Sequence, residues 1–405
     1  MELTETDVQM VYANDDVEVK FLDQGGSRLL MTFAPLNYNE TMDLFWGHRF
    51  ARKAGLSAIG FVAKKPNWYP GIYVRPAIEA IAALLARFPD RIAYGSSMGG
   101  YGALKYSSAL GATATLAFGP QTSINPADGI TQPGFTRHFI AGLHDDMAVD
   151  GADVAANSYL FYDPRERFDL ANAGMIGQAA PAIHQVRIPF AGHECVKIIA
   201  GSEPALRLID LCARGDLQGV NRAVRALRAP SGVRATGIAR ALLARHPDCA
   251  IRIGGQFKDR FDRKSRALFE HDIAKMHLAN GEALLAMRHV QIARRIMPRY
   301  MLFIKTHGAI LEALERWGSA HRVYSESLAI DDADAVTHCV LARIEVELGR
   351  WEQALESCRK ALAILPDHPR ILRRVAAIHQ ACGAMAAAHY NNLARKAEAR
   401  AASVT

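Results

Sequence analysis

The sequence predicts an α/β unit with a mostly parallel sheet, followed by an all-α unit made of helical repeats. Two observations lead to this fold class. Over residues 17–193, short runs rich in β-branched and aromatic residues alternate with helical stretches, which is typical of parallel strands joined by helices on both faces of a sheet. From residue 205 onward these strand signals vanish, and Ala, Leu and Arg dominate.

The charge of the chain changes at the same point. Residues 1–204 carry 16 Lys and Arg against 21 Asp and Glu, whereas residues 205–405 carry 32 against 20. The hydrophobic fraction of 50% and the charged fraction of 22% over 405 residues fit a globular protein with more than one core. We therefore expect an α/β domain at 1–204, a helical linker or degenerate repeats at 205–266, and repeats at 267–402.

The α/β half is expected to contain seven strands and four helices. The strands are expected at Val17–Leu22, Arg28–Phe33, Ser57–Ala63, Arg91–Tyr94, Ala114–Phe118, Ser158–Tyr162 and Val186–Pro189. The helices are expected at about Tyr38–Ala54, Arg75–Arg87, Gly100–Leu110 and Arg137–Asp146. Ligands of such sheets bind at the carboxyl ends of the strands.

A Gly-x-Ser-x-Gly pattern at Gly95–Gly99 follows one of these strands and opens a helix. A serine between a strand and a helix must turn sharply, and flanking glycines remove the Cβ atoms that would clash there. The turn would lift the Ser97 hydroxyl out of the sheet edge. The pattern therefore predicts a nucleophile at Ser97.

A serine nucleophile needs a base and a group that orients the base. After Ser97, one strand-like run leads to Asp163 and a later one to His193. The order Ser, Asp, His resembles that of the α/β-hydrolases. The resemblance implies Ser97 as nucleophile, His193 as general base and acid, and Asp163 as the residue that orients His193, with Asp169 as the alternative acid. Two other histidines follow no strand-and-glycine run: His144 and His184.

The same resemblance implies an oxyanion hole of two backbone N–H groups. Met98 supplies one, and the loop after Arg28–Phe33 is expected to supply the other. The usual His-Gly pair is absent from that loop and Pro35 has no N–H, which leaves Ala34, our preferred donor, or Leu36.

Two loop residues are expected to shape the substrate pocket. Trp68 follows one strand and offers a surface for a sugar or an acyl chain, and Gln121 follows another strand. The segment Gly95–Leu104, followed by Gly119-Pro120-Gln121, also resembles serine esterases and acyltransferases linked to bacterial surface glycans.

The second half has a period of 34 residues. Small residues and prolines recur at this spacing, for example at Ala274, Gly308, Ala342 and Ala376, and the copy with Gly349 and Pro366 is the clearest. The pattern resembles the tetratricopeptide repeat, in which small residues let paired helices cross closely. The resemblance implies a protein partner or self-association, and the basic balance favours an acidic partner. The aromatic residues that single-stranded RNA requires are not interleaved, which argues against nucleic acid.

The remaining expectations concern absent features. There is no apolar run of about 18 residues that would span a membrane, no secretory signal in the acidic residues 1–7, and no Cys-x-x-Cys pair among six scattered cysteines. We expect a cytoplasmic protein with reduced thiols. We expect no cofactor and no metal, because no phosphate-binding loop exists and His144-Asp145-Asp146 would diverge on a helix.

These observations predict a serine hydrolase of esterase or acyltransferase type, acting on an acylated glycan or another small ester, with a repeat domain for protein interaction. The alternative is a non-catalytic scaffold in which a decayed hydrolase domain and the repeats together bind a partner. The incomplete oxyanion loop favours the scaffold, and the intact order of Ser97, Asp163 and His193 favours the enzyme.

Overall fold

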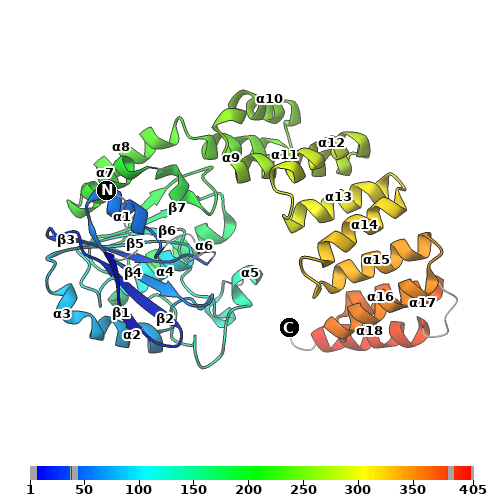
Figure 1. The fold of residues 1–405 in the computed structure, drawn as a ribbon, viewed down its shortest axis with the longest axis horizontal. Helices are drawn as coiled ribbons and strands as arrows, with labels where there is room; N and C mark the ends of the chain where they lie inside the picture. The colour runs from blue at the N-terminus through cyan, green and yellow to red at the C-terminus, as the bar shows by residue number, and fades with distance from the viewer. Residues whose placement is uncertain are drawn as a thin grey trace. The chain divides into compact units, whose positions relative to one another are not determined.

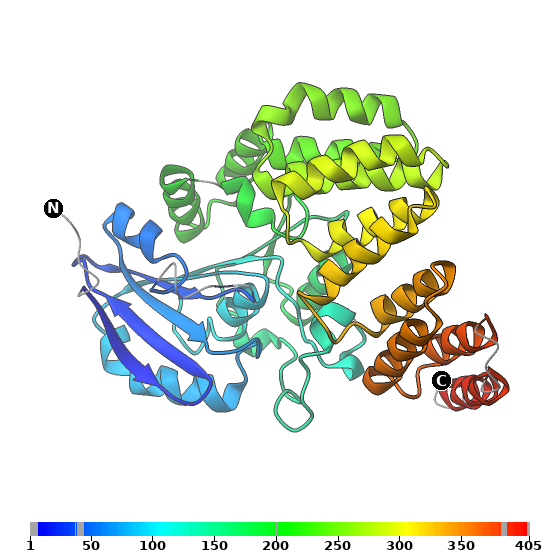
Figure 2. The same ribbon diagram turned by 45° about the vertical axis from the view of Figure 1, so that its right-hand side comes forward.

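The computed structural model describes residues 7–36, 38, 44–130, 132–199, 201–381 and 387–402. The chain divides into two compact units between Gly237 and Ile238. Figures 1 and 2 show the strands and helices of both units.

The described residues of the first unit form one eight-stranded sheet, in the order β1-β2-β4-β3-β5-β6-β7-β8. β2 is antiparallel to both of its neighbours, and all pairs from β4 to β8 are parallel. The mostly parallel sheet is therefore confirmed. The strands are β1 (Val8–Ala13), β2 (Val17–Leu22), β3 (Arg28–Phe33), β4 (Ser57–Ala63), β5 (Asp90–Ser96), β6 (Ala114–Phe118), β7 (Ser158–Tyr162) and β8 (His184–Arg187).

Three expectations about the strands and helices of this unit need correction. β1 was not predicted: its sequence is mostly apolar, but apolar and polar residues do not alternate along it, and none of its six residues is buried. β8 begins before the expected range and ends at Arg187. The helix expected at Arg137–Asp146 is wrong: Gly142 has a φ of 79°, and the His144 ring accepts the Ile140 N–H, which closes a turn there.

The other helices of this unit are shorter than expected. Only the end of the first expected range is helical among the described residues, as α1 (His48–Ala54); residues 39–43 of that range lie outside them. The second range is divided into α2 (Gly71–Ala80) and α3 (Ala82–Leu85), and the third forms α4 (Met98–Lys105). In the loops and after β7 lie α5 (Pro133–Thr136) and α6 (Arg167–Ala179).

The first unit extends past the boundary expected at residue 204. Helices α7 (Ser202–Ala213) and α8 (Leu217–Arg228) bury Leu208, Ile209 and Val220 in a core that also contains β5, β6 and β7 side chains. A second core contains the buried side chains of α2 and α4 with other side chains of the sheet. Residues 205–228 are therefore part of the α/β unit, because their amphipathic faces pack in the core of the sheet.

The second unit consists of helices. After α9 (Gly232–Leu242), which crosses the unit boundary, and α10 (Pro247–Phe257), four antiparallel pairs follow in series (Figures 1 and 2). The pairs are α11 (Arg263–Ala279) with α12 (Ala283–Ile296), α13 (Met301–Ala313) with α14 (Trp317–Leu328), α15 (Ala335–Glu347) with α16 (Trp351–Ile364), and α17 (Pro369–Ala381) with α18 (Ala387–Ala402).

The 34-residue period corresponds to these pairs. The small residues at the helix-crossing positions from Ala274 to Ala376 are buried: Ala274, Ala286, Ala293, Gly308, Ala320, Ser327, Ala342, Ala354, Ala361 and Ala376. Gly281 and Gly349 turn between paired helices with φ of 79° and 69°, and Glu315 adopts the same left-handed conformation at 55°. Gly383, the next position in the series, lies outside the described residues. The turn between paired helices therefore keeps the same left-handed conformation, even where Glu315 stands in place of a glycine.

No helix in the described part of the chain is both long enough and apolar enough to cross a membrane.

Candidate functional site

Ser97 lies on a sharp turn between β5 and α4. Its φ of 55° and ψ of −123° are rare for a residue with a side chain. A Cβ on Gly95 would lie 2.0 Å from the Gly99 carbonyl oxygen, and a Cβ on Gly99 would lie 2.1 Å from the carbonyl oxygen of Phe33. Both glycines of the pattern are therefore required by close backbone packing. The side chain of Ser97 stays partly exposed at the carboxyl edge of the sheet.

A continuous hydrogen-bond chain joins Ser97, His193 and Asp169. His193 Nε2 is 2.9 Å from Ser97 Oγ, and His193 Nδ1 is 2.8 Å from Asp169 Oδ1. An ionised carboxylate only accepts hydrogen bonds, so His193 Nδ1 carries the proton and donates a hydrogen bond to Asp169. In the neutral ring Nε2 is then left to accept from the Ser97 hydroxyl. The arrangement is that of a nucleophile, a base and a group that orients the base.

The surroundings of His193 set its protonation. Burial is the largest influence and acts to lower the pKa of His193, but the hydrogen bond and charge of Asp169, with the charges of Glu194 and Glu166, outweigh it. The pKa therefore lies above the ordinary value of 6.5. The Asp169 side chain is only 5% exposed, whereas His193 is 29% exposed, so the ring is the part of the pair that solvent and ligands reach.

The structure places Asp163, the acid preferred from the sequence, away from the His193 ring. One carboxylate oxygen of Asp163 accepts the Gly192 N–H at 2.8 Å and the other accepts the Arg165 N–H at 2.9 Å. Asp163 is thus engaged by the backbone that precedes His193. The alternative, Asp169, reaches the ring from the first turn of α6. The expectation that Asp163 orients His193 is wrong on this geometry.

The second expected oxyanion donor also needs correction. The Ala34 N–H donates to the Phe61 carbonyl oxygen at 3.0 Å, and the Ala34 carbonyl accepts the Tyr69 hydroxyl at 2.7 Å. Because β3 continues its pairing with β4 by one residue, the preferred donor is already engaged. Leu36 carries the next N–H of that loop. Met98, the first residue of α4, has an N–H with no acceptor within its own helix.

Trp68 and Gln121 meet each other inside the protein. Trp68 Nε1 donates to Gln121 Oε1 at 2.9 Å, and the Gln121 amide nitrogen donates to the Gly119 carbonyl. Their side chains are almost completely buried. They therefore form an inner wall beside the site and do not offer the exposed sugar platform that the sequence suggested.

Phe135, in α5, is a site residue that the sequence analysis missed. Its ring centroid lies 5.8 Å from that of His193 and 5.3 Å from that of Trp68. The Phe135 side chain is partly exposed. It belongs to a long irregular stretch, where neither strand nor helix periodicity indicates which side chain turns toward the sheet edge.

His144 and His184, the other histidines considered from the sequence, have contacts of their own in the first unit. His144 is buried, accepts the Ile140 N–H at Nδ1 and donates from Nε2 to the Asn67 carbonyl, and the ring of His184 packs against Tyr159. No cluster of metal-ligating side chains occurs among the described residues. The five cysteines in the described ranges form no disulfide, and Cys382 lies outside them.

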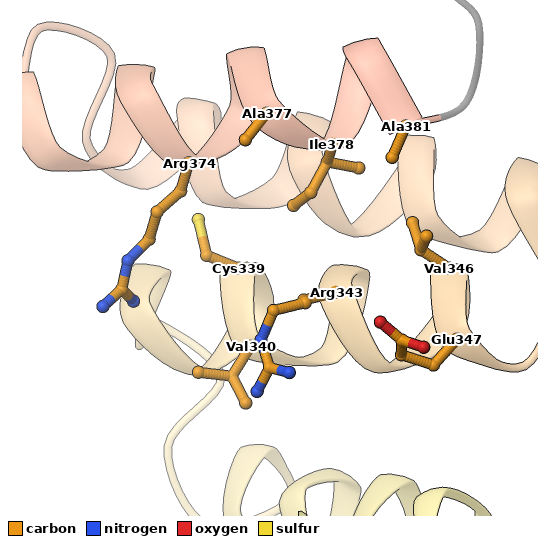
Figure 3. A pocket seen from close by; sticks show the side chains of 9 residues that line it. All are labelled: Cys339, Val340, Arg343, Val346, Glu347, Arg374, Ala377, Ile378 and Ala381. Carbon is orange, nitrogen blue, oxygen red and sulfur yellow. The ribbon is translucent and has the colours of Figure 1, made fainter.

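The repeat unit has a groove between α15 and α17, with a cavity of about 340 Å³ (Figure 3). Cys339, Val346 and Ile378 contribute to its apolar lining, and the side chains of Arg343 and Arg374 also line it. Burial raises the pKa of the Cys339 thiol to about 11. The groove therefore has an apolar floor flanked by charged side chains, and its thiol is unreactive.

Comparisons with known proteins concern the repeat unit. No known protein-family model matches the chain. The TPR repeat-containing thioredoxin TTL4 of Arabidopsis thaliana is 32% identical over 70 residues, and the Inactive TPR repeat-containing thioredoxin TTL3 of the same plant is 27% identical over 120 residues. These matches cover 17% and 30% of this chain, and only 10% and 15% of the relatives.

Two solved structures are also similar in part. MamA from Desulfovibrio magneticus RS-1 matches 42% of this chain and 96% of its own, at 16% identity and a TM-score of 0.37. A Podosopora anserina putative kinesin light chain, with nearly identical TPR-like repeats, matches 42% of this chain and 97% of its own, at 18% identity and the same TM-score. The sequence matches and the buried 34-residue pattern agree: the C-terminal region resembles tetratricopeptide repeats.

Proposed function

We propose that the first unit is a serine hydrolase of esterase type, related to the α/β-hydrolases, and that the repeat unit binds a protein partner. The observation that carries the enzymatic proposal is the hydrogen-bond chain from Ser97 through His193 to Asp169. Two further features support the relation to the hydrolases. β2 is antiparallel to β4 while the strands from β4 to β8 are parallel, and Ser97 lies on a sharp turn between a strand and a helix.

The proposed reaction proceeds through an acyl-enzyme. Ser97 Oγ attacks an ester carbonyl while His193 Nε2 takes its proton, and Asp169 stabilises the resulting imidazolium. The N–H groups of Met98 and Leu36 would stabilise the oxyanion. His193 then returns the proton to the leaving alcohol, and a water or another hydroxyl attacks the acyl group and regenerates Ser97.

The proposed substrate is a small ester such as an acylated glycan. Phe135 and the buried Trp68 give one side of the site an apolar character, which suits an acyl group. Transfer to a hydroxyl of a second glycan would use the same acyl-enzyme as hydrolysis. The proposed location is the cytoplasm, where the cysteine thiols would stay reduced.

The proposed role of the repeat unit is to bind a protein or a second copy of the chain. Helical repeat arrays present an extended surface to partners, and the groove between α15 and α17 offers apolar side chains flanked by Arg343, Arg374 and Glu347. Residues 205–405 carry 32 basic against 20 acidic residues, which favours an acidic partner surface.

A non-catalytic scaffold is the second candidate function. It is favoured by the comparisons, in which the matched proteins are repeat proteins, and by the engagement of the Ala34 N–H with Phe61. In that case the first unit would bind a partner without turnover.

Labelling with a fluorophosphonate probe separates the two candidates. The enzyme proposal expects labelling of the wild-type chain and of Ser96→Ala, and none of Ser97→Ala. Ser96 is the matched control because it is the adjacent serine and its side chain is buried. Absence of labelling in a wild-type chain that is folded would favour the scaffold.

A further inference from the structure

Phe190 has a backbone conformation that is unusual for an aromatic residue. It lies in the short loop between β8 and His193, and its φ of 67° is in the left-handed region that favours glycine. Its side chain is partly exposed and belongs to neither hydrophobic core of the first unit, among the residues that the structure describes. Core packing therefore does not explain why an aromatic residue stands where glycine would be unstrained.

The segment after β7 contacts this loop at two points. The Arg165 guanidinium lies 4.7 Å from the centre of the Phe190 ring, within the range of a cation–π contact. The Arg165 N–H donates to one carboxylate oxygen of Asp163 at 2.9 Å, and the other oxygen accepts the Gly192 N–H at 2.8 Å. Asp163 is only 2% exposed, so both of its hydrogen bonds are shielded from water. Arg165 and Asp163 therefore hold both ends of the segment from Phe190 to Gly192.

Two further contacts fix the same loop. A Cβ on Gly237 in α9 would lie 2.3 Å from the Phe190 carbonyl oxygen, so only glycine allows the two backbones to approach this closely. At the start of the loop, the Ile188 N–H donates to the Tyr162 carbonyl oxygen at 2.7 Å, which continues the pairing of β8 with β7 by one residue. The backbone is therefore fixed on the way from β8 to His193.

We propose that Phe190 and Arg165 are positioning residues for His193. The His193 ring must meet two partners at once, with Nε2 2.9 Å from Ser97 Oγ and Nδ1 2.8 Å from Asp169 Oδ1. A shift of the loop by about 1 Å would take both distances beyond hydrogen-bond range. Glycine in place of Phe190 would have no ring for Arg165 to contact and would allow the loop more conformations.

Fluorophosphonate labelling of the full chain tests the role of Phe190. Phe190→Gly should label roughly tenfold more slowly than the wild type, because it loses the cation–π contact and gains backbone freedom, each worth a factor of about two to five. Phe190→Tyr keeps an aromatic ring and should restore the rate to within about twofold of the wild type. Equal rates for Phe190→Gly and the wild type would overturn the proposal.

The role of Arg165 is tested against a neighbouring arginine. Arg165→Gln should label about two- to fivefold more slowly than the wild type. Arg167→Gln is the matched control, because it removes the same charge and a similar contact, 5.5 Å from the centre of the Phe168 ring, which is outside the loop. Equal rates for Arg165→Gln and Arg167→Gln would overturn the role of Arg165. The Arg165 side chain is exposed, so this comparison also decides the proposal if Phe190→Gly does not fold.

Titration of His193 followed by NMR gives a readout that does not require catalysis. Burial lowers the pKa of His193, but the hydrogen bond and charge of Asp169 outweigh it and hold the pKa above 6.5. Phe190→Gly removes no charge and retains the Glu194 and Glu166 carboxylates that also act on the ring. Looser contact with Asp169 should therefore move the midpoint down toward 6.5. An unchanged midpoint in the folded variant would show a purely structural role and overturn the proposal.

The contribution of Phe190 and Arg165 to catalysis rests on the proposed hydrolase function, whereas their effect on the His193–Asp169 contact does not. If the wild type is not labelled at all, the hydrolase proposal fails, and the titration alone then decides whether Phe190 positions His193. If the wild type is labelled and neither Phe190→Gly nor Arg165→Gln slows the reaction, the positioning proposal fails and the hydrolase proposal stands.

Discussion

Replacing Asp169 by Asn tests which of the two acidic residues near His193 orients its ring. The Asn side chain keeps the shape of Asp169 but presents either an amide oxygen or an NH₂ group to His193 Nδ1, at the position now 2.8 Å away. When the NH₂ group faces the ring, the neutral imidazole holds its proton on Nε2 and no longer accepts from Ser97. The serine then has no base.

The expected loss is large and differs between the two sites. In serine hydrolases a wrong His tautomer lowers the rate by roughly 10⁴-fold, which corresponds to about 5.5 kcal/mol of activation free energy. Asp163→Asn keeps one oxygen for the Gly192 or the Arg165 N–H and leaves the His193–Asp169 contact in place. We expect this variant to label less than about tenfold more slowly, because the hydrogen bonds that it weakens are to backbone N–H groups and not to the His193 ring. Loss of one of them should instead lower the free energy of unfolding by about 1.5–3 kcal/mol.

The assay is the second-order rate constant of fluorophosphonate labelling for the wild type and both variants at one pH. Circular dichroism melting of each variant controls for unfolding. A slower rate for Asp163→Asn than for Asp169→Asn, with both variants folded, would refute the assignment of Asp169 as the orienting acid.

Three further predictions follow from the geometry. Labelling should increase as pH rises through a pKa above 6.5, because His193 must be neutral to accept a proton and its pKa is raised; a rate profile from pH 5 to 9 with a midpoint below 6.5 would contradict this. Glu315→Gly should raise the free energy of unfolding by about 1 kcal/mol, because Glu315 has a φ of 55° that glycine adopts without strain; urea titration measures it, and a loss of stability would count against strain there. Gly308→Ala should lower stability by about 1–3 kcal/mol, because the new Cβ would lie 2.6 Å from the Tyr324 ring; an unchanged urea midpoint would show that the ring moves freely.

Features that depend on local sequence were predictable. The glycines around Ser97 form a pattern within five residues, and the backbone contacts that require Gly95 and Gly99 follow directly from the sharp turn. The burial of the small residues in the repeats is likewise predictable from their spacing alone, because the position at which two helices cross recurs every 34 residues. His193 was found because its position at the end of a strand-like run is also a local signal.

Features that depend on contacts between distant segments were not predictable. Asp163 and Asp169 both follow β7, and only the approach of the β8 loop decides which one faces His193. The Ala34 N–H is engaged because β4 continues beside β3 by one more residue. Helices α7 and α8 have the composition of the repeats. They belong to the first unit because they pack on one face of its sheet, which their composition does not reveal.

The most direct test of the central claim is the intact mass of the full chain after reaction with a fluorophosphonate. We expect one adduct per wild-type chain, mapped by peptide fragmentation to Ser97, and no adduct in Ser97→Ala or His193→Ala. An adduct on another residue, or an unmodified wild-type chain with an intact fold, would contradict it.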